Sequence, residues 1–584
     1  MPDIAVTASD QSLDDQIYAG LDFNDPKSFF LFAGAGSGKT RSLVNVLVRI
    51  RDQSDLTLRL NRKQVAVITY TNAASDEIKH RLDYNPLFLV STIHSFVWEL
   101  IKTYQTDIRD WLSKSIQEDI KKLGAENAKG RTGTKAAAER DASIQQKQTR
   151  LASLNNIRQF TYSPTGQNNS RDSLNHSEVI KMTADLLRTK PLMQEILVSQ
   201  FPILFIDESQ DTNRALIDAL FAVQQAHSKR FSLGLFGDMM QRIYADGKID
   251  LGQNLPGDWL KPVKTINYRC PVRVVTLINK IRSQVDNQMQ KPRENQIEGH
   301  ARLFIATRNG GDRDSIENNI AAQMSQVTQD ELWSGAGADI KILTLEHHMA
   351  ASRMGFSTLF EALSKDEKLR TGLLDGSLAG IRFFTQLILP IAKAGANGDS
   401  FAIARITKEA SPLLAKQLIK EAENPRDIYQ QVDRAVQSLL LLWNDNNVPR
   451  LIDIINEVAD TGLFTLPELF SIIIKVQDEE LNEAENDTDG EEDESDTSIA
   501  AWEEALNCSW KELEHYNYYI TGQSRFDTHQ GVKGLQFPRV MVIIDDEEAR
   551  GFMFNYSKLF GVQPLSDSDK KIYEMARRRA STEQ

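Results

Sequence analysis

The segment AGAGSGKT at residues 33–40 constrains the fold of this chain more than any other feature of its sequence. It follows the apolar run FFLFA and precedes the apolar-periodic stretch LVNVLVRI, so we predict a strand, a glycine-rich loop and a helix in that order. The glycines allow successive backbone N–H groups to converge on phosphate oxygens, and the N-terminus of the following helix adds positive potential. Lys39 would reach the β- and γ-phosphates of a nucleoside triphosphate, and the Thr40 hydroxyl would ligate Mg²⁺. Ala33 stands where the strict pattern has glycine, but the strand–loop–helix context favours a phosphate loop over a chance glycine-rich turn.

A second apolar run, ILFIDESQD at residues 203–211, ends in adjacent acids. Asp207 at the strand tip would hold Mg²⁺ through water, and Glu208 would orient or deprotonate the attacking water. Phosphoryl transfer depends on positioning and charge neutralisation more than on covalent chemistry, so these few groups suffice. An Asp–Glu pair alone is often a helix cap. Its combination with the phosphate loop favours the functional interpretation.

Short apolar runs recur along the chain and alternate with helical stretches. They lie at residues 28–34, 65–71, 202–207, 231–238 and 539–545. Strands that are apolar on both faces and alternate with helices are what a buried parallel sheet requires. We therefore predict an α/β fold with a doubly wound nucleotide-binding core, whose ligands bind at the carboxyl ends of the strands. A second α/β unit is expected from about residue 276, with strands at residues 301–307 and 339–346.

A largely helical segment interrupts each of these cores. We expect a first core at residues 1–100 and 179–275 with a basic helical insertion at 101–178, and a second core at 276–355 and 511–584 with a helical insertion at 356–510. Residues 121–160 carry nine Lys/Arg against three Asp/Glu, which indicates either an arm that faces phosphates or a solvated helix face. Residues 478–496 carry twelve Asp/Glu and no Lys/Arg, a composition typical of a disordered acidic linker.

The overall composition excludes several classes of protein. The two cysteines, Cys270 and Cys508, are too few for a disulfide framework or a four-cysteine metal site. We find no apolar run of about 18 residues and no signal peptide, so we expect no membrane association and a cytoplasmic location. The net charge of −13 argues mildly against a protein coated with nucleic acid, but a binding groove needs only local positive charge.

An ordered series of further elements surrounds the phosphate loop and the acid pair. These are Gln16, TYTNAASDEIKHRL at residues 69–82, STIHSF at 91–96, GDMMQRIY at 237–244, NYR at 267–269 and THQGVKGLQF at 528–537. In kind and order they resemble the elements of the UvrD/Rep/PcrA group of superfamily 1 DNA helicases. The resemblance implies two RecA-like P-loop cores with parallel sheets, each with a largely helical insertion, and it implies the use of ATP and Mg²⁺.

The resemblance also implies a role for each matching residue. The catalytic set would be Lys39, Asp207, Glu208, Gln241 and Arg269, and Thr40 and Asp207 would bind the metal. The nucleotide contacts would be Gln16, Ala33, Gly34, Ala35, Gly36, Ser37, Gly38, Lys39, Thr40, Arg41, Tyr268, Gly534 and Gln536. The residues facing DNA would be Thr71, Asn72, His94, Phe96, Tyr244, Thr528 and His529. Taken singly, Phe96 is more typical of a core residue and His94 of a satisfied polar residue.

The sequence departs from the family pattern in three places. Asp246 stands where the family has a tryptophan that stacks on a DNA base, a contact of about 1–3 kcal/mol. Gln536 replaces a glutamate but still offers a hydrogen bond to a ribose hydroxyl. The sixth element of the family, which supplies a second γ-phosphate arginine, is not found before the chain ends at Gln584. We expect either impaired hydrolysis or a partner that supplies the missing part.

The leading interpretation is an ATP-dependent helicase that moves 3′ to 5′ on single-stranded DNA and unwinds duplex DNA. A second is a DNA-dependent ATPase switch or accessory subunit of a nuclease or defence complex, and a third is a DNA-binding fragment without turnover. Single-stranded or duplex DNA, and a nuclease or other protein, are the expected partners. The sequence leaves the pathway open among repair, replication restart and phage defence.

Overall fold

The computed structural model divides the chain into two compact units, Met1–Phe304 and Ile305–Gln584, which we describe separately. The residues that the structure describes are 8–22, 25–129, 135–163, 172–243, 247–248, 250–252, 255–283, 286, 288–306, 312–421, 424–444, 447–474, 494–550, 555–559, 561, 563–571 and 574. Most of the expected acidic linker, residues 478–493, lies outside them.

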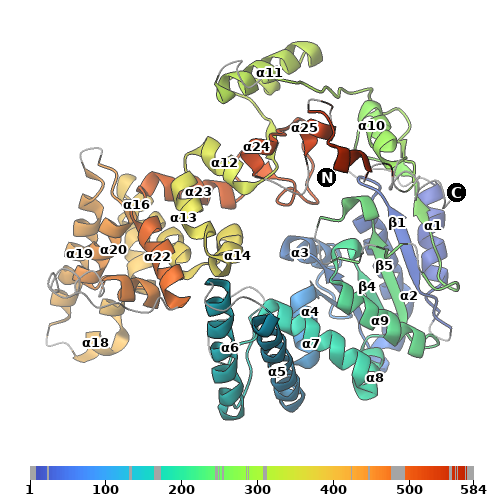
Figure 1. Ribbon diagram of the computed structural model, residues 1–584, viewed down its shortest axis with the longest axis horizontal. Helices are drawn as coiled ribbons and strands as arrows, with labels where there is room; N and C mark the ends of the chain where they lie inside the picture. The colour runs from blue at the N-terminus through green and yellow to red at the C-terminus, as the bar shows by residue number, and fades with distance from the viewer. Residues whose placement is uncertain are drawn as a thin grey trace. The chain divides into compact units, whose positions relative to one another are not determined.

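The first unit is built on a six-stranded parallel sheet (Figure 1). Its strands are β1 (Phe29–Ala33), β2 (Val65–Thr69), β3 (Phe88–Thr92), β4 (Ile203–Ile206), β5 (Ser232–Gly237) and β6 (Val263–Lys264). They lie in the order β3-β2-β4-β5-β1-β6. This confirms the α/β class, and the apolar runs at 28–34, 65–71, 202–207 and 231–238 each contain a strand.

Alternate residues of β1, β2, β4 and β5 enter separate cores on the two faces of the sheet. In β4, Ile203 and Phe205 pack with α1 (Ala8–Ala19), α2 (Lys39–Leu60) and α3 (Asn72–Arg81). Leu204 and Ile206 pack with helices of the other face, including α4 (Ile93–Ile101), α7 (His176–Thr189), α8 (Pro191–Gln200) and α9 (Arg214–Ala226). Because all strands are parallel, the loops that follow β1, β4 and β5 meet at one edge of the sheet.

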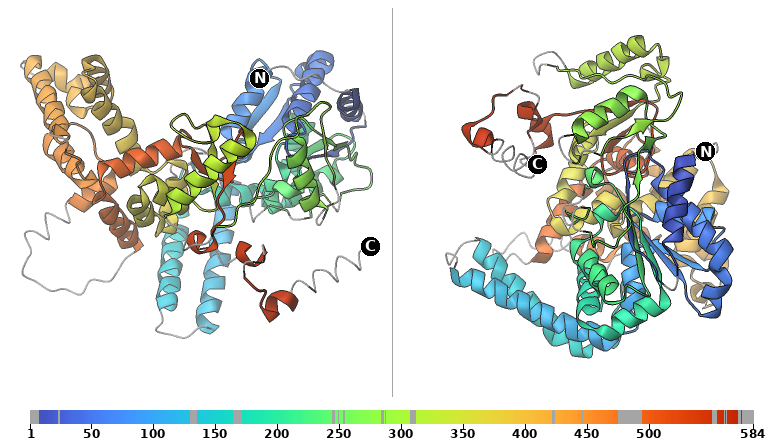
Figure 2. Two further views of the ribbon diagram at one scale, coloured as in Figure 1. Left: turned by 90° about the horizontal axis from the view of Figure 1, so that it is seen from above. Right: turned by 90° about the vertical axis from the view of Figure 1, so that its right-hand side faces the viewer.

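The basic insertion contributes two long helices, α5 (Gln105–Lys129) and α6 (Lys135–Ser153), which run side by side in both panels of Figure 2. Lys147 Nζ on α6 lies 2.7 Å from an Asp119 carboxylate oxygen on α5, and Arg150 makes hydrogen bonds of 2.6 and 3.0 Å to Glu178. Some of the Lys and Arg side chains of this segment are therefore paired with carboxylates of the same unit.

The remaining elements of the first unit come after β6 in the chain. They are β7 (Ile266–Asn267), α10 (Val272–Arg282) and β8 (Lys291–Pro292), with β7 parallel to β8. Residues 301–306 form no strand, contrary to the expectation for 301–307. Leu303 and Ile305 are 64% and 68% exposed, so the apolar alternation of this segment has no sheet to pack on.

The second unit contains a three-stranded parallel sheet in the order β10-β9-β11. The strands are β9 (Lys341–Thr344), β10 (Phe526–Thr528) and β11 (Val540–Val542), so the strands expected in 339–346 and 539–545 form. In the part of the chain that the structure describes, β11 is the last strand of this sheet, and Val540 and Val542 are 38% and 55% exposed.

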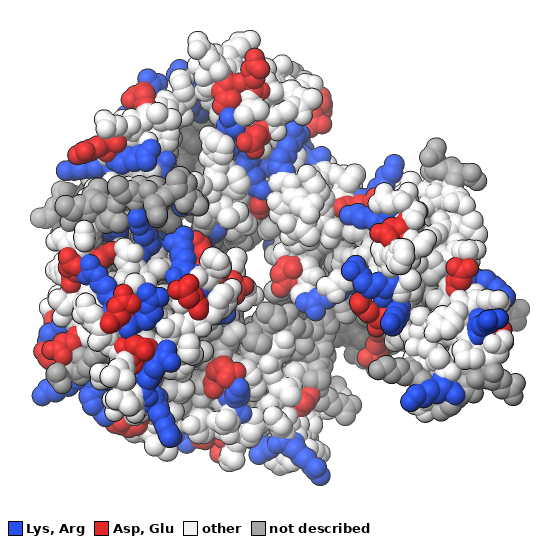
Figure 3. Space-filling view, turned by 180° about the vertical axis from the view of Figure 1, so that it is seen from behind, with Lys and Arg blue, Asp and Glu red and all other residues white. Residues whose placement is uncertain are grey.

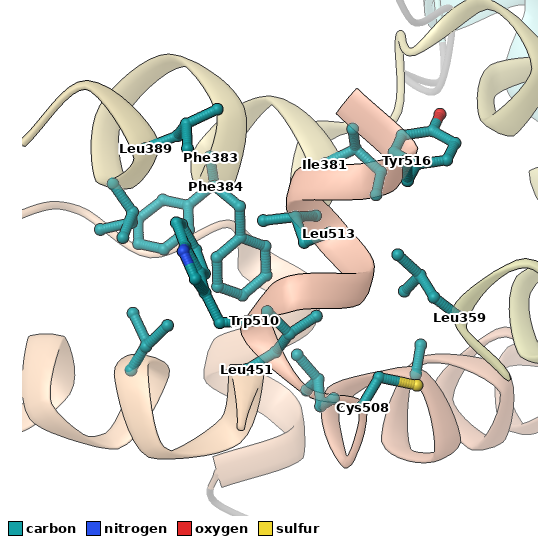
Figure 4. Packing of buried hydrophobic residues seen from close by; sticks show 14 of the residues in the cluster. Leu359, Ile381, Phe383, Phe384, Leu389, Leu451, Cys508, Trp510, Leu513 and Tyr516 are labelled. Atoms are coloured by element: carbon teal, nitrogen blue, oxygen red, sulfur yellow. The ribbon is translucent and has the colours of Figure 1, made fainter. Parts of the chain in front are cut away.

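Most of the second unit is helical and has its own core. Its helices are α11 (Arg313–Thr328), α12 (His347–Met354), α13 (Ser357–Ser364), α14 (Glu367–Asp375), α15 (Ala379–Arg382), α16 (Leu389–Ala396), α17 (Ser400–Ala410), α18 (Lys416–Glu421), α19 (Pro425–Leu441), α20 (Leu451–Thr461), α22 (Glu494–Leu506), α23 (Trp510–Ile520), α24 (Asp546–Ala549) and α25 (Tyr556–Leu559), with a π-helical turn at Phe383–Ile388. Figure 4 shows Phe384 and Trp510 in this core beside Leu451 and Leu513. No helix in the described ranges is both long and apolar enough to cross a membrane.

Candidate nucleotide-binding site

The loop between β1 and α2 has the backbone that phosphate binding requires. Gly36 and Gly38 have φ of +69° and +81°, and Gly38 is the N-cap of α2. Ser37 is buried, and its Oγ donates to the Gly34 carbonyl at 2.7 Å, which fixes the turn. The backbone N–H groups at the start of α2 therefore face the carboxyl edge of the sheet, where an anion would be stabilised.

Lys39 and Glu208 meet at this loop. Lys39 Nζ donates to Glu208 Oε2 at 2.9 Å, and the two side chains are only 9% and 21% exposed. Glu208 follows β4 with φ of +51°, and its backbone N–H donates to Asp207 Oδ1 at 3.0 Å. Two of the expected motifs, 169 residues apart, thus form one charged cluster.

The NYR segment at residues 267–269 is docked on the same loop. Tyr268 N donates to the Gly36 carbonyl at 2.9 Å, and Asn267 Nδ2 donates to the Ala35 carbonyl at 2.8 Å. A Cβ added to Gly36 would lie 2.8 Å from the Cβ of Arg269. The structure therefore places the Cβ of Arg269, which the family resemblance expects to reach the γ-phosphate, beside the phosphate loop.

Asn267 is a site residue that the sequence did not single out. Its Oδ1 accepts the backbone N–H groups of Arg269 and Cys270 at 3.0 and 2.8 Å, so its side chain shapes the turn that carries the arginine. Gln290 supports it from β8's side, with Nε2 donating to the Ala35 carbonyl at 3.2 Å and Oε1 accepting from Asn267 at 3.1 Å. The NYR triplet was a visible signal for Asn267, whereas no pattern marked Gln290.

The loop after β5 brings Gln241 to the same edge of the sheet. Gln241 Nε2 donates to Asp238 Oδ2 at 2.6 Å. Asp238 is buried and accepts Arg282 Nη1 at 2.9 Å, and its backbone N–H donates to Gln210 Oε1 at 3.1 Å. Gln241 is therefore one member of a hydrogen-bonded network whose other members carried no assigned role.

The remaining expected nucleotide contacts are spread over both units. Gln16 lies on α1 with an exposed side chain, and Ala33, Thr40 and Arg41 flank the glycine loop. Gly534, with φ of +82°, and the exposed Gln536 belong to the second unit.

The residues expected to face DNA in the first unit occupy different environments. Thr71 caps α3 by accepting the Ala74 N–H at 3.2 Å, and Asn72 is the first residue of that helix. The His94 ring lies 5.0 Å from that of His176 in a T-shaped arrangement. Phe96 is 2% exposed, so the structure corrects its expected contact with DNA to a position in the core. Tyr244 and Asp246 lie outside the described residues.

In the second unit, Thr528 and His529 follow β10. Thr528 is 2% exposed, and its Oγ1 accepts the Gly531 N–H at 3.3 Å. Its side chain therefore stabilises the turn after β10 and does not face solvent. Its neighbour Asp527 lies 3.1 Å from Lys341 Nζ of β9. His529 is exposed.

Charge is not concentrated in one surface patch on the face drawn in Figure 3, where Lys/Arg and Asp/Glu side chains are interspersed. This agrees with the paired cations of α6 and with the net charge of −13. Any binding of a polyanion therefore depends on local groups and not on a uniformly basic surface.

The residues present fit a magnesium–triphosphate group. Thr40 follows Lys39 in α2 and Asp207 precedes Glu208, so a hydroxyl and a carboxylate are offered next to the two paired residues; Mg²⁺ bound with phosphates needs only one or two protein oxygens because water and phosphate supply the rest. The described residues hold no cluster of three or more His, Cys, Asp or Glu that would bind a metal by itself, which such a shared site does not need.

Comparisons with known proteins agree with this geometry. Residues 22–246 match the family described as UvrD/REP helicase N-terminal domain. The chain is 24% identical over 629 residues to Gabija protein GajB of Bacillus cereus (strain HuB5-5). This alignment covers 90% of this chain and 86% of that protein. It is 27% identical over 298 residues to ATP-dependent DNA helicase PcrA of Staphylococcus aureus (strain Mu50 / ATCC 700699), which covers 45% of this chain and 38% of that protein. These matches and the clustered motifs support a UvrD/PcrA-like superfamily 1 helicase, with the family match lying in residues 22–246.

Proposed function

We propose that this protein is an ATP-dependent DNA helicase that hydrolyses ATP to move 3′ to 5′ along single-stranded DNA and to unwind duplex DNA. The observation that carries the proposal is the ion pair of 2.9 Å between Lys39 and Glu208, beside the turn that bears Arg269. It supports one triphosphate site built from three separate motifs of the first unit. The direction of movement rests on the resemblance alone.

In this proposal each side chain has a defined task. Lys39 leaves Glu208 and binds the β- and γ-phosphates, which frees the carboxylate to orient the attacking water. Thr40 and Asp207 would hold Mg²⁺, which neutralises charge on the phosphates. Arg269 stabilises the charge that develops on the transferred group. Tyr268 offers a ring face to the adenine.

The Lys39→Ala substitution tests the site. It removes the phosphate-binding ammonium group, so we expect ATP turnover with single-stranded DNA to fall by about 10²–10³-fold, as on loss of one preorganised donor. Steady-state phosphate release measures this. Lys102→Ala is the matched control, because Lys102 forms a surface pair with Glu99 at 2.6 Å and its side chain is 42% exposed. Full turnover by Lys39→Ala would refute the proposed site.

A second candidate is a DNA-dependent ATPase switch or accessory subunit that acts with a nuclease or other protein in a defence complex. It is favoured by the extent of the alignment with Gabija protein GajB, 90% of this chain, against 45% with the PcrA helicase. Strand displacement on duplexes with 3′ or 5′ tails separates the two candidates. A helicase displaces the strand on the 3′-tailed substrate, whereas a switch hydrolyses ATP without displacement on either.

A further inference from the structure

Arg282, near the C-terminal end of α10, is a buried cation that no motif marks. The residue is 4% exposed, and its guanidinium donates to Asp238 at 2.9 Å and to Asp286 at 2.6 and 3.2 Å. Asp238 is 3% exposed. Removal of one partner from a buried ion pair leaves an uncompensated charge and is strongly unfavourable. The pair is therefore more than a surface contact.

The oxygen of Asp238 that binds Arg282 also holds Gln241. Asp238 Oδ2 accepts Gln241 Nε2 at 2.6 Å and Arg282 Nη1 at 2.9 Å. The family resemblance implies that Gln241, a member of the catalytic set, senses the γ-phosphate, and its amide N–H is the group that it would donate to a phosphate oxygen. In this arrangement the same amide nitrogen donates to Asp238.

A line of hydrogen bonds joins the backbone of Asp238 to the phosphate loop. Asp238 N donates to Gln210 Oε1 at 3.1 Å, and Gln210 Nε2 donates to Glu208 Oε2 at 2.5 Å. The same Glu208 oxygen accepts Lys39 Nζ at 2.9 Å. A change at Lys39 therefore has a route of polar contacts to the backbone of Asp238, the residue whose carboxylate holds Gln241.

We propose that Arg282 is a positioning residue that, through Asp238, controls the release of Gln241 to the nucleotide and so couples nucleotide binding to DNA-stimulated turnover. The proposal rests on the proposed function of the same site. When Gln241 leaves Asp238, Arg282 remains to compensate the buried carboxylate, which makes the release energetically accessible. Without Arg282, the buried carboxylate of Asp238 keeps Gln241 as its remaining side-chain donor, and the exchange fails.

A structural role alone would have a different signature. If Arg282 only joins α10 to the sheet, its loss lowers the stability of the unit, and nucleotide affinity and stimulated turnover fall together. If Arg282 acts through Gln241, its loss has little further effect once the Gln241 amide is absent. A double-mutant cycle distinguishes these cases, because residues that act through one another are not additive.

The first experiment measures the ratio of ATP turnover with and without an oligo(dT) strand. We expect Arg282→Met to lower this ratio by about tenfold, within the usual range of coupling between two sites, and Arg282→Lys to restore part of it. Asp286→Asn is the matched control, because it removes the other carboxylate of Arg282 but leaves Asp238 paired. In a Gln241→Ala background, Arg282→Met should change the ratio by less than about twofold. Additive effects would overturn the proposal.

The second experiment needs no turnover. Hydrogen–deuterium exchange is followed in residues 33–40 and 237–243 of the full chain, with and without Mg²⁺ and ATPγS. In the wild-type chain we expect the nucleotide to change exchange in both segments, and in Arg282→Met and Arg282→Lys we expect a normal change at 33–40 but a reduced one at 237–243. A normal change at 237–243 in the folded Arg282→Lys and Arg282→Met chains contradicts the proposal. Absence of DNA-stimulated turnover in the wild-type chain, by contrast, contradicts the proposed function and the coupling to DNA, while the exchange at 237–243 still tests whether Arg282 controls the release of Gln241.

Discussion

Position 36 must be glycine for two independent reasons. Its φ of +69° is a conformation that side-chain-bearing residues rarely adopt, and an added Cβ would lie 2.7 Å from Asn267 Oδ1 and 2.8 Å from the Cβ of Arg269. We expect Gly36→Ala to weaken nucleotide binding by about tenfold or more, because the strain alone is about 1 kcal/mol and the arginine turn must also move. Titration with a fluorescent ADP analogue measures the dissociation constant.

Gly124→Ala provides the control for that substitution. Gly124 lies within α5, and an added Cβ there meets nothing within 4 Å. The alanine should raise the free energy of unfolding by up to about 1 kcal/mol and leave nucleotide affinity unchanged. An unchanged dissociation constant for Gly36→Ala would mean that the NYR turn is not part of the site.

The sequence predicts those site residues whose role follows from local context. Lys39 begins the helix that follows the glycine loop and Glu208 follows an apolar strand, each within a recognisable pattern, and the structure brings them to 2.9 Å. The buried contact of Arg282 could not be predicted, because its partner Asp238 lies 44 residues earlier in the chain. Phe96 shows the opposite case, since a motif position suggested a surface role but its apolar ring is buried against Phe201.

At the scale of elements, burial decides which strands could be predicted. The runs that formed β1, β2, β4 and β5 are apolar on both faces, and a central parallel strand needs that pattern whatever its neighbours are. Residues 301–306 have a similar composition but form no strand. A strand exists only with a hydrogen-bonding neighbour, and composition does not reveal whether one is available.

The contact between α12 and α23 predicts a pH dependence for the second unit. His347 Nδ1 lies 2.7 Å from the Tyr519 hydroxyl, and burial lowers the pKa of His347 to about 4 against the opposing effect of Asp527. The unfolded chain has a histidine pKa of about 6.5, so it binds more protons than the folded chain between these values. The free energy of unfolding should therefore fall by up to about 1.4 kcal/mol for each pH unit between about pH 6.5 and about pH 4.

Urea unfolding followed by tryptophan fluorescence at about pH 7.5 and about pH 5 checks this dependence. His347→Gln removes the titrating group but retains a hydrogen-bonding side chain toward Tyr519, so its stability should vary less with pH. Equal pH dependence in both proteins would contradict the assignment.

At the scale of the whole molecule, the chain comprises two units with separate hydrophobic cores. The phosphate loop, the acid pair and Arg269 all belong to Met1–Phe304. We therefore expect calorimetry to show two unfolding transitions. Mg–ADP should raise the midpoint temperature of only one of them. Saturation at about 100 times the dissociation constant stabilises the binding unit by about 2.7 kcal/mol, a shift of several degrees.

Lys39→Ala supplies the control for this experiment. It should abolish the shift and leave both transitions in place, because the substitution removes a phosphate contact at the loop and not a core contact. The two units would be shown to unfold together if the nucleotide raised the midpoint temperature of both transitions equally. A single cooperative transition would show the same.

The end of the second sheet has a consequence for how the protein behaves in concentrated solution. Val540 and Val542 present branched apolar groups to water on β11, the last strand described in that sheet. A strand in such a position is a template for any other extended segment, including the same strand of a second molecule. High protein concentration during expression or storage therefore favours aggregation through β11. A chaperone or binding protein that covers this strand would reduce that aggregation.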